Sequence, residues 1–180
     1  MTHGPGPTPW QRAGDDEVAY DGFARILRRP LLLPDGRQAV WDIHDSPPTV
    51  SVLALTDDHH VVLVEQYRPG PDRVVLSLPG GLVDHGEEPV AAGLRELREE
   101  TGYAVGAAEL VASIDPPSHT QPRHVVLARG AHHVGAQRLD ELEEIDVVLI
   151  PVAELRRRLP TGRLGATEQT YLALDHAGLL

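Results

Sequence analysis

The chain has 180 residues, no cysteine, and 16 basic against 27 acidic residues, which gives a net charge of -11. This length suits one compact domain, or one domain with a small appendage. Without cysteine, disulfides and thiolate metal ligands are excluded, so a bound metal must be held by oxygen or imidazole, and Mg²⁺ or Mn²⁺ are the natural candidates. The acidic surplus argues against a nucleic-acid surface held by general electrostatics.

The N-terminal segment, residues 1–16, is rich in Gly and Pro and shows no periodicity, so we expect a flexible tail. It lacks the apolar core of a signal peptide, and no stretch of about 20 apolar residues could span a bilayer. The sequence therefore predicts a soluble, cytoplasmic protein without a membrane partner.

Short strands follow the tail. Residues 17–46 are predicted to form a small antiparallel β extension, broken by a strong turn signal at Pro34-Asp35-Gly36. The apolar runs 49–56 and 61–67, separated by four polar residues, predict a hairpin. Both predictions rest on alternating strand patterns bounded by turn residues.

The clearest helix covers residues 88–101, with Pro89 in its first turn and Gly102 where a left-handed cap belongs. Strands are predicted near 110–114, 124–128 and 146–150, and helices over 152–159 and 166–177. Strands mixed with a few helices indicate an α/β or α+β sandwich.

The second half of the predicted helix 88–101 carries Glu96, Glu99 and Glu100, which lie on neighbouring turns of one face. Three carboxylates this close repel one another unless a positive charge lies among them, and divalent cations would supply it. The alternative is a solvated helix face on which Arg95 and Glu99 form an ordinary i,i+4 pair.

The loop before this helix favours the metal interpretation. Every defined position of the Nudix box is matched, by Gly81, Glu87, Arg95-Glu96-Leu97, Glu99-Glu100, Gly102 and Tyr103. Tyr103 occupies the last position, which is usually aliphatic. The chain thus resembles Nudix hydrolases.

The resemblance implies an α/β/α sandwich with a mixed sheet over residues 47–180 and metal ligation by the carbonyl of Gly80 and by Glu96, Glu99 and Glu100. It gives Gly81, Glu87, Arg95 and Gly102 structural roles, with Glu87 and Arg95 fixing the loop against the helix.

The string VVLVEQYRPGPDRVVLSLPGGLVD before the box is similar to the ADP-ribose pyrophosphatase branch of that family. The resemblance places Arg68 against a substrate phosphate or the terminal ribose; a surface arginine closing a strand is the alternative. Past the box, Asp115-Pro116-Pro117-Ser118 occupies the place of a proline typical of the branch, and Asp115 is counted with the substrate-binding residues.

The N-terminal extension also fits this branch, in which such strands join a homodimer and supply aromatic rings that enclose the adenine. Phe23 and Trp41, 18 residues apart on either side of the turn, occupy the matching places, although each could instead be a core residue of the sheet. Asp42 is expected to read the base or ribose.

The catalytic base is expected in the acidic loop that holds Glu141, Glu143 and Glu144; counting back from Pro151 favours Glu143, with Glu144 beside it. If this loop is only a solvated turn, Glu99 must serve as the base.

The expected reaction is metal-dependent attack of water on the pyrophosphate of ADP-ribose or a related ADP-sugar, giving AMP and a sugar phosphate. Two alternatives stay open: another nucleoside diphosphate derivative (a dinucleotide, a GDP-sugar, coenzyme A or an oxidised nucleotide), or a non-catalytic ADP-ribose-binding sensor.

Overall fold

A computed structural model describes residues 6–180 of the chain, and residues 1–5 of the predicted tail lie outside them. The chain divides into two compact units. The N-terminal unit comprises the described part of Met1–Ser46 together with Asp115–Gln121, and the larger unit comprises Pro47–Ile114 and Pro122–Leu180.

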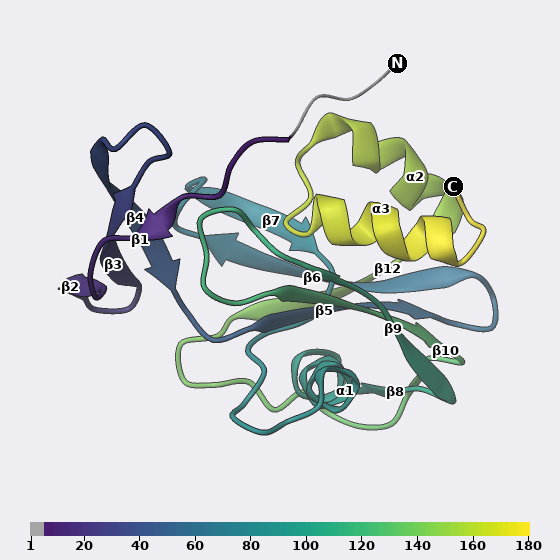
Figure 1. The fold of residues 1–180 in the computed structure, drawn as a ribbon. Helices are drawn as coiled ribbons and strands as arrows, with labels where there is room; N and C mark the ends of the chain where they lie inside the picture. Colours follow the sequence, from purple (N-terminus) through teal and green to yellow (C-terminus); the bar gives the residue numbers. More distant parts are fainter. Residues whose placement is uncertain (1–5) are drawn as a thin grey trace, which may run out of the picture. The chain divides into compact units, whose positions relative to one another are not determined.

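The N-terminal unit is a four-stranded antiparallel sheet centred on β3 (Arg25–Leu32), with β1 (Gln11–Arg12), β2 (Glu17–Asp21) and β4 (Gln38–Asp45) paired to it (Figure 1). The reversal between β3 and β4 uses Gly36, whose φ of 85° favours glycine. A small antiparallel sheet is thus present where the sequence predicts one.

Strand β1 lies inside the segment for which the sequence predicts a flexible tail. Its two residues pair with Leu31 and Leu32, and Asp16 accepts hydrogen bonds from the guanidinium groups of Arg12 (2.6 Å) and Arg29 (2.7 Å). Backbone pairing and ion pairs hold this segment, and neither needs apolar residues at regular spacing. The sequence therefore shows no strand pattern here.

The segment Asp115–Gln121 is attached to β4. The amide of His44 donates to the carbonyl of Ser118 (2.8 Å), the amide of Thr120 donates to the carbonyl of His44 (2.9 Å), and the rings of His44 and His119 stack with centroids 4.8 Å apart. Asp115 therefore belongs to the same unit as Trp41, although more than 70 residues separate them in the chain.

A six-stranded mixed sheet forms the centre of the larger unit. Its strands are β5 (Thr49–Leu55), β6 (His60–Arg68), β7 (Arg73–Ser77), β9 (Ala107–Ile114), β10 (Arg123–Arg129) and β12 (Ile145–Pro151). The order is β12-β6-β5-β10-β9, with β7 also paired to β6, and only the β5–β10 pair is parallel. A separate ladder joins β8 (Tyr103–Ala104) to β11 (His132–His133).

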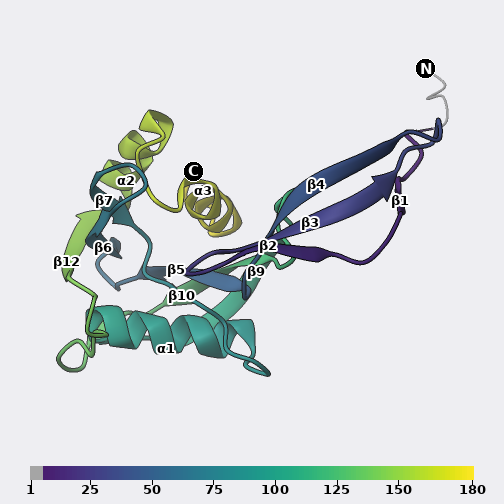
Figure 2. The same cartoon turned by 90° about the vertical axis from the view of Figure 1, so that its left-hand side faces the viewer.

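Helices cover both faces of this sheet. Helix α1 (Pro89–Thr101) lies on one face, and α2 (Val152–Arg158), a 3₁₀ turn (Leu159–Thr161) and α3 (Thr167–His176) lie on the other (Figures 1 and 2). Each face has its own apolar core, one around Val52 and Leu97 and the other around Leu63 and Leu174. The predicted α/β sandwich with a mixed sheet is confirmed.

Helix α1 ends at Thr101, and Gly102 follows with a φ of 72°, which gives the left-handed cap that the sequence predicts. Glycine is required here for a second reason, since a Cβ on Gly102 would lie 2.0 Å from the carbonyl oxygen of Gly135. No helix among residues 6–180 has the length and hydrophobicity needed to cross a bilayer.

Candidate active site

The glycine loop between β7 and α1 is fixed on β5 by backbone hydrogen bonds. The amide of Val52 donates to the carbonyl of Pro79 and that of Val50 to the carbonyl of Gly81, both at 2.9 Å. This pairing does not use the carbonyl of Gly80, the predicted metal ligand. Gly80 has a φ of 154°, and a Cβ there would lie 2.1 Å from the carbonyl oxygen of Val50. Only glycine can occupy the position.

Gly81 faces the acidic helix. A Cβ at this position would lie 2.6 Å from the carboxylate of Glu96. The loop backbone and this side chain are therefore in close contact, which explains why glycine stands at the first position of the motif. The loop and the helix form one continuous surface around Glu96.

Arg95 is the centre of an ion-pair network. Its guanidinium donates two hydrogen bonds to the carboxylate of Glu87 (3.0 and 3.1 Å) and one to the carbonyl of Leu82 (3.0 Å), and so ties the loop to the helix. It also contacts Glu96 (2.8 Å) and Glu99 (3.1 Å). The hydrogen bonds from Arg95 hold the pKa of Glu87 below its usual range.

Glu100 is the most deeply buried acid of the helix, with 4% of its surface exposed. Its carboxylate accepts a 2.8 Å hydrogen bond from the amide of Gly80. The pKa of Glu100 is raised to about 7, mainly by burial; the Gly80 hydrogen bond and Arg68 oppose the rise, and the charges of Glu96 and Glu143 contribute to it. Burial likewise raises the pKa of Glu96, with Arg95 opposing it. A buried carboxylate among other carboxylates favours a cation nearby.

Two residues from outside the helix act on this cluster electrostatically. Arg68, at the end of β6, and Glu143, in the loop before β12, both influence the pKa of Glu100, so both lie within range of its charge. The structure thus brings together Arg68, Glu96, Glu100 and Glu143, four residues that the sequence assigns to the site.

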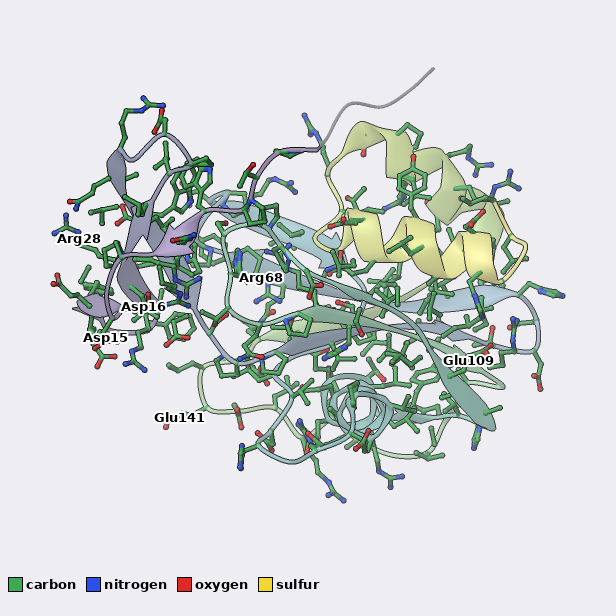
Figure 3. The ribbon with its side chains drawn as sticks, in the orientation of Figure 1. Asp15, Asp16, Arg28, Arg68, Glu109 and Glu141 are labelled. Atoms are coloured by element: carbon green, nitrogen blue, oxygen red, sulfur yellow. The ribbon has the colours of Figure 1, made fainter. Side chains whose placement is uncertain are left out.

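The three acids of the loop before β12 differ in burial. Glu143 is partly buried and accepts a 3.0 Å hydrogen bond from the amide of Asp140, whereas Glu141 and Glu144 are exposed. Figure 3 shows Glu141 at the outer edge of this loop and Arg68 beside the sheet. Among the three acids, Glu143 is the one that acts on the helix carboxylates.

The sequence interpretation missed Gln137. Its side-chain amide donates to the carbonyl of Glu100 (2.6 Å) and to that of Ile145 (3.0 Å), and so joins the end of α1 to the beginning of β12. A glutamine 37 residues from its partner leaves no local pattern, so nothing in the sequence pointed to it.

The donor set suits a hard divalent cation, because carboxylate and carbonyl oxygens are the ligands that such ions prefer. In the described chain, no three acidic or histidine side chains already converge at ligand distance. The guanidinium of Arg95 contacts Glu96 and Glu99, and so supplies positive charge beside both carboxylates. Each contact uses one oxygen of the carboxylate, and the other oxygen does not bind Arg95.

The predicted adenine-binding residues lie in the N-terminal unit. Phe23 is fully exposed at the turn between β2 and β3, and Trp41, on β4, is 48% exposed, so neither is a core residue. The edge of Trp10 packs against Trp41, with ring centroids 5.7 Å apart. Asp42 follows Trp41 in the strand and faces the opposite side of the sheet. Asp115 is exposed.

The chain is similar to several known proteins. The NUDIX domain model matches residues 45–170. The chain is 36% identical over 179 residues to an ADP-sugar pyrophosphatase of Mus musculus (89% of this chain, 80% of that one). It is 33% identical over 125 residues to an ADP-ribose pyrophosphatase of Bacillus subtilis (68% of each).

Another relative is named as an activator of a dehydrogenase and not as a pyrophosphatase. The chain is 32% identical over 150 residues to a methanol dehydrogenase activator of Bacillus methanolicus (82% of this chain, 80% of that one). A solved structure described as an ADP compounds hydrolase superposes with a TM-score of 0.79 at 21% identity over 98% of this chain and all of that one, which shows a shared fold. The motif, the fold and the matched length lead to one conclusion: the chain is a member of the Nudix family.

Proposed function

We propose that this protein hydrolyses the diphosphate bond of ADP-ribose or a related ADP-sugar, releasing AMP and a sugar phosphate. The observation that carries the proposal is the burial of Glu100 against the Gly80 amide, within range of Glu96, Glu143 and Arg68. The names of the mouse and Bacillus subtilis relatives support an ADP-sugar as the substrate.

The proposed metal ligands are the carbonyl of Gly80 and the carboxylates of Glu96, Glu99 and Glu100, and the ion is Mg²⁺ or Mn²⁺. When bound, such an ion lowers the pKa of water and neutralises charge on a phosphate. Arg95 holds Glu96 and Glu99 in place between turnovers, and its bidentate pair with Glu87 keeps the glycine loop against α1.

Glu143 is the proposed general base, because it is the acid of its loop that lies within range of Glu96 and Glu100. It would accept the proton of the attacking water, while Arg68 stabilises negative charge on the departing phosphate. Glu144, exposed in the same loop, and Glu99, on the helix, are the alternative bases.

The adenine is proposed to stack between Trp41 and Phe23 contributed by two chains of a homodimer. Within one chain, Trp41 pairs with Arg29 and the strand end at Arg25 pairs with Asp45. Phe23 lies beyond that end, so at least four strand residues, about 13 Å, separate the two positions along the sheet. This separation supports a base enclosed by the rings of two chains. The cytoplasmic location stays a prediction.

Turnover of ADP-ribose with Mg²⁺, followed by chromatography of the products, tests the function. The wild-type protein should release AMP and ribose 5-phosphate in equal amounts, and Glu100→Gln should lose at least about 100-fold in kcat. Glu168→Gln, which removes an exposed acid on α3, is the matched control and should keep full activity. Equal activity in the Glu100 variant would reject the site.

A further inference from the structure

A hollow lies beside Arg68, within the larger unit. It is a cavity of about 510 Å³ between the β6–β7 turn and the segment before α3, and its lining includes Arg68, Arg73, Ser77, Leu164 and Gly165. This size is within the usual range for a small-molecule site. The lining residue Ser77 stands three residues before Gly80, so the cavity adjoins the glycine loop of the proposed active site.

The walls of the cavity are fixed by close packing. The amide of Gly165 donates to the carbonyl of Leu76 (2.9 Å), and a Cβ on Gly165 would lie 2.8 Å from the hydroxyl of Ser77. At the β6–β7 turn, the hydroxyl of Tyr67 donates to Asp72 (2.5 Å), whose φ is 53°. The hollow therefore has a defined shape.

The cavity carries unneutralised positive charge. The guanidinium of Arg73 donates only to backbone, at 3.4 Å to the carbonyl of Val74 and 3.3 Å to that of Arg163. Among the ion pairs of residues 6–180, none includes Arg68 or Arg73. Two such cations at one hollow, in a chain of net charge -11, would attract an anionic ligand.

The lining also distinguishes between the two halves of an ADP-sugar. No aromatic ring is among the lining residues, so a base would find nothing to stack on. Guanidinium groups and a hydroxyl instead match the phosphate and hydroxyl groups of a sugar phosphate.

We infer that the cavity is the subsite for the sugar-phosphate half of the substrate and that Arg73 binds that half. This inference rests on the proposed function. Arg68 would hold the phosphate nearest the cleaved bond, and Arg73 would bind the sugar hydroxyls. Arg73 then determines affinity for the sugar half without taking part in the chemical step.

Calorimetry with each product, without metal, tests this inference separately from turnover. Ribose 5-phosphate and AMP are titrated into the wild-type protein, Arg73→Gln, and the control Arg157→Gln, which removes an exposed arginine on α2 with the same change of charge. Loss of one charge-assisted contact should weaken ribose 5-phosphate binding about tenfold in Arg73→Gln. AMP binding should stay within about twofold, and the control should alter neither.

The inference fails if wild-type protein does not bind ribose 5-phosphate, if Arg73→Gln binds it as well as wild type, or if AMP weakens equally. Should Arg73→Gln not fold, Arg73→Lys keeps the charge but loses the planar fork, and it should bind ribose 5-phosphate more weakly than wild type; equal binding overturns the inference. In turnover, Arg73→Gln should raise KM and preserve kcat. A protein that binds ribose 5-phosphate through Arg73 but does not cleave ADP-ribose would contradict only the proposed function.

Discussion

The carboxylate of Glu100 and the amide of Gly80, 20 residues apart in the chain, are joined by a 2.8 Å hydrogen bond. This contact joins the glycine loop to the buried end of the acidic face of α1. It also fixes the Pro79–Gly80 peptide, next to the peptide that carries the proposed ligand, the carbonyl of Gly80. The glycine loop and the acidic face of α1 are therefore coupled, and a substitution in either should affect both.

The two adjacent glycines should respond differently to alanine. At Gly80 the new Cβ meets the backbone of β5, at 2.1 Å from the Val50 oxygen, so Gly80→Ala should lose about 3 kcal/mol or more of unfolding free energy. At Gly81 the Cβ meets only the movable carboxylate of Glu96, so Gly81→Ala should keep most of its stability and lose about 10- to 100-fold in kcat. Denaturant unfolding measures the stability of both variants, and steady-state kinetics measures their kcat. A larger loss of stability in Gly81→Ala than in Gly80→Ala would contradict this prediction.

Removal of Arg95 should make the protein more dependent on metal for stability. Arg95→Met deletes the hydrogen bonds to Glu87 and Leu82 and leaves Glu96 and Glu99 without their cation, at a cost of about 2 kcal/mol. Because the repelling carboxylates remain, Mg²⁺ should raise the Tm of this variant more than that of the wild type. Thermal scans with and without Mg²⁺ measure the difference, and an equal rise in both proteins counts against the proposed role of Arg95.

Trp41→Ala should raise KM for ADP-ribose several-fold while changing kcat little, because stacking binds the substrate in the ground state and the transition state alike. Steady-state kinetics over a range of ADP-ribose concentrations measures both parameters. Tyr171→Ala, which removes an exposed aromatic residue from α3, serves as the control. An unchanged KM in the Trp41 variant would remove Trp41 from the substrate site.

Acid should loosen the N-terminal unit through Asp16. Hydrogen bonds from Arg29 and Arg12 lower the pKa of Asp16 from 3.8 to about 2. Because the folded-state pKa is below the ordinary value, the stabilisation is complete above pH 4 and is lost as the pH falls toward 2. Asp16→Asn should therefore be less stable than wild type at pH 6, and the two should converge near pH 2.

Both tryptophans of the chain, Trp10 and Trp41, lie in the N-terminal unit, so their fluorescence during denaturant unfolding reports on this unit alone. Asp15→Asn, which changes a neighbouring exposed acid, is the control. A gap between wild type and Asp16→Asn that persists unchanged at pH 2 would show that the ion pairs of Asp16 are not responsible.

Features that depend on local sequence were predictable. Pro89 and Gly102 mark the ends of α1, and the spacing of Glu96, Glu99 and Glu100 places them on neighbouring turns, because helix geometry needs only nearby residues. Likewise, α2 and α3 lie within a residue of the predicted bounds. Strand alternation and turn residues were enough to predict the hairpin of β5 and β6.

Features that depend on long-range contact were not predictable. The clamp by Gln137, the attachment of Asp115–Gln121 to β4 and the cavity between Arg73 and Gly165 each join segments that are distant in the chain. The network of Arg95 with Glu96 and Glu99 is of a different kind. The sequence suggested its parts, but only the structure shows that the guanidinium engages the predicted metal ligands.

The most direct test of the central claim is Mn²⁺ binding, followed by electron paramagnetic resonance and calorimetry on the wild-type protein and Glu100→Gln. We expect the wild type to bind Mn²⁺ with a signal that changes when ADP-ribose is added, and we expect Glu100→Gln to bind at least about tenfold more weakly. Equal Mn²⁺ affinity in the two proteins, or no binding by the wild type with nucleotide present, would contradict the assignment of this acidic cluster as the metal site.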